Sequence, residues 1–458
     1  MDVRDRALLD LQSVLDVKPP TKPRFDPQEA SYLEFKSRVG KLLKESLGDD
    51  YQDFLQKIFL NFLPPLLRAA GEHENLHKVE CEEEIKQIDE VFDRDLHHLS
   101  HSPMVFPLNR QVFRSVAPAS PSLDLGVGPG QNSSYTMHGR KLDVGSDIMV
   151  SNLIKARARK SHENFAALDM GNVPFADNTF QRVYALNCLY HVQLGRKKAL
   201  EEISRVLAPG GQVAITDVSP YLNDFKPLRG FFESMGFTKL SEEFSRYFLA
   251  GFGADGTPGS EEFYTDALLE LGFENIHIRY IMSPRLSRLS YLFYDWQALF
   301  NMDAQAGLKD GPDKEHLMKV YRATLNKVVA PLLRLDEEIC SREKRGGYIF
   351  VTAQKRGTSK PTPKFDWREH LICPVSKAPL VEKDGHFHCE KSDMTYPVVD
   401  GIPLLTDFYS ANVELAEAVN AAATSSNGKA KKTASKTGTC CKSWSACSTR
   451  ANRPPRPN

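Results

Sequence analysis

A glycine-rich loop limits what this chain can fold into more than any other segment. The stretch SLDLGVGPGQNS begins at Ser122 with a short apolar strand and then places Gly126, Gly128 and Gly130 at alternate positions. Glycine lets the backbone turn sharply and approach a ligand with no side chain between them. A dinucleotide-binding loop would have its third glycine where this chain has Gln131. The loop therefore predicts a ligand at the end of a strand, and it leaves the kind of ligand open.

Strand and helix patterns alternate from this loop to about residue 356. The strand patterns are SLDLGV, KLDVGSD, RVYALN, QVAITDV, IHIRYIM and YIFVTAQ, and the helical patterns between them are SNLIKARARK, KKALEEISRVL and TDALLELG. Such alternation is typical of a mostly parallel sheet that helices cover on both faces. We therefore predict an α/β domain over residues 116–356. Its helical, aromatic-rich insertion at about 284–345 is interpreted as a lid or a wall of the substrate site.

Polar residues stand where the expected strands end. Asp147 ends the second strand about twenty residues after the glycine loop, where a carboxylate can accept both hydroxyls of a ribose. Asp169 ends a further strand in NFAALDMG, the third along the chain, and the run Asn187-Cys188-Leu189-Tyr190-His191 follows RVYALN, the fourth. Because open α/β sheets bind ligands at the carboxyl ends of their strands, these residues predict one shared site.

Four motifs in this order resemble the class I S-adenosylmethionine-dependent methyltransferases, in particular the small-molecule branch that includes the ubiquinone and menaquinone biosynthesis enzymes. The motifs are LDLGVGPG, the acidic Asp147, LDMGNVPFADNTF and RVLAPGGQVAITD. The resemblance is close over residues 120–220 and looser to about 356. It implies a Rossmann-like, doubly wound, seven-stranded methyltransferase sheet and S-adenosyl-L-methionine as the cofactor.

The resemblance also implies roles for individual residues. Asp124 and the three glycines would line the methionine and ribose portion, and Asp147 would hold the ribose hydroxyls. Asp169 would take the adenine amino group, with Met170 against the ring and Asn187 beside the methionine moiety. The expected cofactor-binding residues are thus Asp124, Gly126, Gly128, Gly130, Asp147, Asp169, Met170 and Asn187.

Methyl transfer from a sulfonium asks for in-line placement of the acceptor, and for a general base only where the acceptor carries a proton. Tyr190 and His191 follow the fourth strand, where the family often places substrate-facing residues, so both are candidate catalytic residues. A helix-start histidine without a catalytic part is the alternative for His191. The run after Asn187 has no Asn-Pro-Pro-Tyr-like loop, which counts against adenine or glutamine as acceptor and leaves O-, C- or other N-methylation open. Further candidates in the insertion are Tyr291, Tyr294, Asp295 and His316, whose spacing also fits a core-packed amphipathic helix.

Composition narrows the class of protein. Lysine and arginine number 59 against 59 aspartates and glutamates, which argues against a dedicated nucleic-acid binder. No apolar run is long enough to span a membrane, and the start MDVRDRALLD is too charged for a secretory signal. Eight cysteines in 458 residues do not form a disulfide framework, so we expect the reducing cytoplasm. Residues 1–115 are expected to be helical, and their acidic stretch at 72–95 predicts a solvated helix face or a cap over a neighbouring site.

Residues 365–409 resemble the small zinc-ribbon-like proteins that activate RNA and protein methyltransferases. The matching features are an opening ICP, a cysteine after a hairpin and the ending YPVVDGIPLL. Serine replaces the second cysteine of each expected metal-binding pair, at Ser376 after Cys373 and at Ser392 after Cys389. Since a hydroxyl is a poor substitute for a zinc-bound thiolate, we expect no metal, although His386 and His388 could complete a ligand set. The module would either stabilise the sheet from within the chain or recruit RNA or a protein.

The remaining tail, residues 410–458, is expected to be disordered. From Thr424 it carries eight lysines and arginines and no acid, so it is either a solvated extension or a weak electrostatic binder. The predicted function of the whole chain is S-adenosylmethionine-dependent methyl transfer to a small organic acceptor. The alternatives are an RNA or protein methyltransferase that uses the ribbon for recruitment, and a non-catalytic cofactor-binding scaffold. The acceptor, the methylated atom and the oligomeric state stay open.

Overall fold

The structure is a computed structural model that describes the chain, with gaps, from residue 41 to residue 406. The described residues are 41–45, 48–49, 80–95, 102–116, 118–137, 139–192, 195–222, 233, 236–242, 259–300, 312–358 and 365–406. The basic tail and most of the expected amino-terminal helices lie outside them. The side chains of Tyr294, Asp295 and His316 also lie outside the described part.

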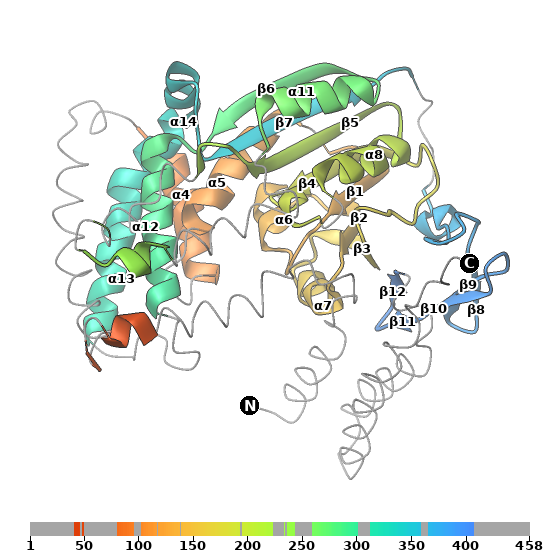
Figure 1. Cartoon of the computed structure of the whole chain (residues 1–458), viewed down its shortest axis with the longest axis horizontal. Helices are drawn as coiled ribbons and strands as arrows, with labels where there is room; N and C mark the ends of the chain where they lie inside the picture. Colours follow the sequence, from red (N-terminus) through yellow and green to blue (C-terminus); the bar gives the residue numbers. More distant parts are fainter. Residues whose placement is uncertain are drawn as a thin grey trace, which may run out of the picture.

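Seven strands form the centre of a mixed α/β fold. They are β1 (Ser122–Leu125), β2 (Leu142–Asp147), β3 (His162–Leu168), β4 (Phe180–Leu186), β5 (Leu207–Val218), β6 (Phe273–Ile281) and β7 (Tyr348–Lys355). Their order in the sheet is β3-β2-β1-β4-β5-β7-β6. The first five strands in this order are parallel to one another, and β7 is antiparallel to both β5 and β6. The predicted doubly wound, parallel-dominated sheet is confirmed (Figure 1).

Helices cover both faces of this sheet, because successive strand residues point to opposite sides. Val183 and Ala185 of β4 pack in one cluster with α8 (Arg196–Val206) and α11 (Glu261–Glu270). Tyr184 and Leu186 of the same strand pack on the other side with a layer of further helices. Two shorter helices follow β1 and β2, at α6 (Gln131–Thr136) and α7 (Val150–Ala158).

The expected insertion is helical, and it packs against helices that precede β1. It comprises α12 (Pro284–Phe300), α13 (Pro312–Thr324), the π-helical η4 (Leu325–Val329) and α14 (Ala330–Glu343). Before β1 come α4 (Glu82–Asp95), α5 (Ser102–Val112) and the short 3₁₀ turn η1 (Phe113–Ser115). Figure 1 shows α4, α5, α12, α13 and α14 gathered on one side of the molecule.

The acidic helix α4 is not a simply solvated face, as one interpretation of the sequence had it. Ile88 and Val91 are buried against the insertion helices. Arg322 pairs with Asp89 at 3.0 Å and Arg334 with Glu84 at 3.4 Å. Two acidic side chains of α4 therefore pair with cations from a segment far away in the chain.

The carboxyl-terminal residues add to the sheet. After the 3₁₀ turn η5 (Trp367–His370), the strands β8 (Val381–Lys383), β9 (His386–Cys389) and β10 (Met394–Tyr396) make a small sheet of their own. The hairpin β11 (Val398–Val399) and β12 (Ile402–Leu405) then joins the main sheet, where β12 runs parallel to β3. In the described part of the chain the sheet has nine strands instead of the seven expected, because β12 pairs with the edge strand β3 and β11 pairs with β12 (Figure 1). No helix in the described part of the chain is long and apolar enough to cross a membrane.

Candidate functional site

The glycine loop joins β1 to α6 and leaves room beside its backbone. Gly128 has a left-handed φ of +54°, and a Cβ placed there would meet no atom of the described residues within 4 Å. Gly126 is different, because a Cβ there would lie 2.6 Å from Cβ of Cys188. Gly130 begins the helix as the N-cap of α6. The loop therefore packs closely on one side and is open on the other, as a backbone that faces a ligand must be.

Asp147 at the end of β2 is tied to this loop. Its Oδ2 accepts a hydrogen bond from the backbone N–H of Gly128 at 2.9 Å, and its Oδ1 accepts one from the N–H of Met149 at 2.8 Å. The side chain is largely buried, with 9% of the residue exposed. Oδ1 also accepts from Nδ2 of Asn152 at 3.3 Å, so the carboxylate is fixed in place against both the loop and the start of α7.

The two carboxylate oxygens of Asp124 in β1 differ in their hydrogen bonds to the described residues. Its Oδ2 accepts from Oγ of Ser133 at 2.6 Å and lies 3.1 Å from Nε2 of His162. Its Oδ1 is buried and has no hydrogen-bond partner among the described residues. A buried oxygen of this kind calls for a donor that a ligand can supply. The sequence did not single out His162, which begins β3 and is buried. A polar residue at a buried strand position was the only signal for it.

Asp169 and Met170 lie in the loop between β3 and β4. Oδ1 of Asp169 accepts from the N–H of Gly171 at 2.8 Å, which fixes the turn. Met170 faces the glycine loop, since its Cε is 3.1 Å from where a Cβ of Gly126 would stand. The loop is also held from the carboxyl-terminal module, where the carbonyl of Pro374 accepts from Nδ2 of Asn172 at 3.2 Å.

Asn187 ends β4 in a left-handed conformation, with φ at +55°. Its N–H donates to the carbonyl of Thr216 at 2.8 Å, and its side-chain Oδ1 is buried without a partner in the described part of the chain. The adjacent Cys188 is fully buried, and burial raises the pKa of its thiol well above the ordinary value. Cys188 is therefore a neutral packing residue that donates to the carbonyl of Leu125 at 3.2 Å.

Tyr190 and His191 lie on the 3₁₀ turn η2 (Leu189–His191), with their ring centroids 4.0 Å apart. Tyr190 is half-buried and packs against a cluster formed by Val218, Leu222 and Tyr291, with Tyr348 at its edge. His191 is exposed. The two candidate catalytic residues thus share one turn, and Tyr190 is the one that faces the apolar interior.

The structure brings the predicted residues together at the carboxyl ends of β1 to β4. The open backbone at Gly128 and the two partnerless oxygens, on Asp124 and Asn187, fit a polar ligand with hydrogen-bond donors. Residues 123–215 match the family model of a methyltransferase domain. The chain contains a methyltransferase domain. The eight expected cofactor residues all lie within the matched segment.

The curated proteins that are similar to this chain each match only part of it. Methyltransferase GfsG of Streptomyces halstedii is 31% identical over 103 residues, which are 21% of this chain and 37% of that protein. Demethylmenaquinone methyltransferase of Paenarthrobacter aurescens is 35% identical over 97 residues, which are 21% of this chain and 38% of that protein. A UPF0434 protein of Alcanivorax borkumensis is 51% identical over 39 residues, 8% of this chain and 63% of that protein. The chain thus spans less than two fifths of the length of the two methyltransferases.

The carboxyl-terminal module gathers the two cysteines and two serines that the sequence singled out. Sγ of Cys373 lies 3.3 Å from Oγ of Ser392, and Oγ of Ser376 lies 3.1 Å from Sγ of Cys389. Burial opposes ionisation of the Cys373 thiol, but hydrogen bonds from Ser376, Ser392 and Tyr396 outweigh it and lower its pKa. No group of three or more His, Cys, Asp or Glu side chains suited to a metal ion occurs among the residues described.

Proposed function

We propose that this chain transfers a methyl group from S-adenosylmethionine to a small organic acceptor. The observation that carries the proposal is the convergence of a left-handed, open Gly128, the buried Asp147 and two partnerless oxygens at adjacent strand ends. Asp147 would hold the ribose hydroxyls, and Asp169 with Met170 would hold the adenine. Oδ1 of Asp124 and of Asn187 would accept hydrogen bonds from the methionine portion. The bound cofactor supplies an activated methyl group on a sulfonium.

The protein's own contribution is placement and exclusion of water. Tyr190 would orient the acceptor from η2, and Val218, Leu222, Tyr291 and Tyr348 form the apolar surroundings of that turn. The hydroxyls of Tyr291 and Tyr348 are 3.5 Å apart, so they offer polar contacts within otherwise apolar surroundings. These surroundings support an uncharged, ring-bearing acceptor of the quinone-like or phenolic kind. His191 would serve as base where the acceptor must lose a proton.

The domain limits belong to the same proposal. We assign residues 116–356 to the methyltransferase domain, with the insertion at about 284–345, and residues 365–409 to the zinc-ribbon-like module. The pairing of Leu404 with Ala167 and of Leu405 with Leu168 supports a stabilising role for the module within the chain, in preference to recruitment. The five described cysteines are free thiols, which supports the cytoplasm as location.

Calorimetry with S-adenosylhomocysteine tests the cofactor site. We expect the full chain to bind it, and Gly128→Arg and Asp147→Ala to lose at least about tenfold in affinity. The matched control is Gly139→Arg, because Gly139 has a similar φ of +74° and equally open space but lies in the turn after α6. An affinity lost equally in Gly139→Arg, or absent in the wild type, would refute the proposed site.

Turnover separates the enzyme from a scaffold. Incubation of the full chain with labelled S-adenosylmethionine and a set of phenols, catechol and naphthoquinols should label at least one of them. Tight cofactor binding with no labelled product from these, from amines or from RNA would favour the non-catalytic scaffold.

A further inference from the structure

Two neighbouring residues at the end of β5 fasten both ends of the turn that carries Tyr190 and His191. The carbonyl of Thr216 accepts from the N–H of Asn187 at 2.8 Å, where the turn begins. Where the turn ends, the N–H of Gly195 donates to the carbonyl of Val192 at 3.0 Å, and Arg196 follows directly as the first residue of α8. Asp217, the neighbour of Thr216, accepts from Nε of Arg196 at 2.6 Å.

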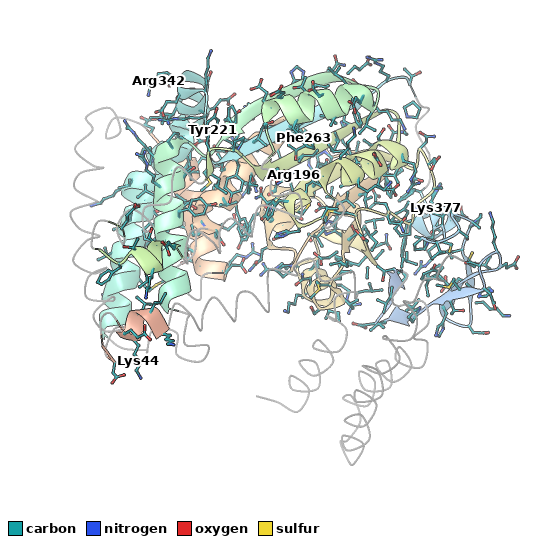
Figure 2. The ribbon with its side chains drawn as sticks, viewed as in Figure 1. Lys44, Arg196, Tyr221, Phe263, Arg342 and Lys377 are labelled. Carbon is teal, nitrogen blue, oxygen red and sulfur yellow. The ribbon has the colours of Figure 1, made fainter. Side chains whose placement is uncertain are left out.

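Asp217 is the centre of a buried network of three side chains. Its Oδ2 accepts from Arg196 and also from the hydroxyl of Tyr264 in α11 at 2.6 Å, while its Oδ1 accepts from the N–H of Val218 at 2.8 Å. Asp217 and Tyr264 are 0% exposed and Arg196 is 2% exposed. We call Arg196, Asp217 and Tyr264 the Asp217 network. Figure 2 labels Arg196 at the start of α8 and Phe263, the neighbour of Tyr264, on α11.

The space around the network is full. A Cβ on Gly259 would lie 2.6 Å from the Tyr264 ring and 2.9 Å from Oδ2 of Asp217. A charge pair removed from water pays a desolvation penalty that can exceed its attraction, so stability alone is a weak reason for placing one here. Hydrogen bonds that several donors make to one fixed carboxylate do, however, set the positions of the elements they join. Those elements are β5, α8 and α11.

We propose that the Asp217 network is a positioning device for the acceptor-side turn, residues 187–192. It fixes the start of α8 relative to β5, and with Thr216 it fixes the turn from both sides. The side chains of Asn187 and Tyr190 are thereby held in place before a ligand arrives. This inference rests on the proposed function, since the turn matters to methyl transfer only if the acceptor meets it there.

Amide hydrogen exchange on the full chain, without ligand, tests the network. In Tyr264→Phe, which keeps the ring and removes one donor, exchange in residues 187–192 should rise at least about tenfold over the wild type. Arg196→Lys keeps the charge and loses the geometry, so its rise should be smaller than that of Arg196→Met. The matched control is Lys197→Ala. It breaks the exposed 2.7 Å pair of Lys197 with Glu270, which joins the same two helices, and should leave exchange in the turn unchanged.

The outcomes separate positioning from plain stability. Faster exchange confined to residues 187–192 and the start of α8 would support the proposal. An equal rise across β1, β2 and β4, or the same rise in Lys197→Ala, would overturn it, as would no change in the turn. If the wild type failed to bind S-adenosylhomocysteine, the proposed function would fail while the exchange result still decided the role of the network.

Discussion

Truncation of one buried leucine tests whether the carboxyl-terminal module is part of the folded sheet. Leu405 in β12 is 0% exposed, pairs with Leu168 of β3, and belongs to the same buried cluster as Phe175 and Val183. Its side chain therefore packs in the same hydrophobic core as side chains of the methyltransferase domain. The change Leu405→Ala removes these contacts and leaves a cavity.

A buried Leu→Ala change costs about 2–5 kcal/mol. A domain of this size loses about 2–4 °C in Tm per kcal/mol, so a loss of about 3 kcal/mol lowers Tm by about 6–12 °C. Thermal unfolding, followed by far-ultraviolet circular dichroism, measures this on the full chain. The midpoint of the main cooperative unfolding transition should shift, and no separate minor transition should appear at lower temperature.

The control for this experiment is Val381→Ala. Val381 belongs to the same module but is 53% exposed, so its truncation should move Tm by less than about 2 °C. If the main unfolding transition of Leu405→Ala were unchanged, the module would be a unit that folds independently of the domain. The docking of β12 on β3 would then have no energetic consequence.

Two further changes probe the helical layer. Burial raises the pKa of Asp336 to about 6, from an ordinary value of 3.8, against the backbone N–H donors of Met282 and Ser283. The folded state then holds this proton more tightly than the unfolded state, so stability from this group is present below about pH 4 and is lost as pH rises through about 6. Urea unfolding should show the wild type losing about 3 kcal/mol relative to Asp336→Asn between about pH 3 and about pH 8, a range that brackets both pKa values. A pH-independent difference would contradict this. Arg322→Ala should lower the free energy of unfolding by less than about 1 kcal/mol, and by less still in 0.5 M salt, because the pair with Asp89 is partly exposed. A larger loss that does not depend on salt would refute this.

The local parts of the fold followed from sequence pattern. The strands around the glycine loop, the helices after them and the helical insertion were predicted, because each pattern depends on neighbouring residues. The acidic helix α4 was harder, since its partner Arg322 lies far along the chain. The addition of the β11–β12 hairpin to the sheet could not be predicted, because strand pairing between β12 and β3 leaves no periodic trace in either segment.

The site shows the same division. Asp147, Asp169 and Asn187 stand at strand ends and were predicted from position alone. Asp217 also ends a strand, but its partners Arg196 and Tyr264 come from two helices, and no spacing linked them. His162 was missed for the same reason, since its contact with Asp124 crosses from β3 to β1. The assignment of roles to these residues stays a proposal until ligand binding is measured.

The sequence by itself determined where the backbone turns and where polar groups end the strands, because glycine conformation and strand period are properties of a few adjacent residues. Only the tertiary structure decided which polar atoms are satisfied. One oxygen of Asp124 is in contact with Ser133 and His162, and the other has no hydrogen-bond partner among the described residues, although nothing near Asp124 in the sequence distinguishes the two. Whether a buried polar atom finds a hydrogen-bond partner depends on contacts between segments that are distant in the chain, in an interior without water. The order of those segments in the sequence does not specify these contacts.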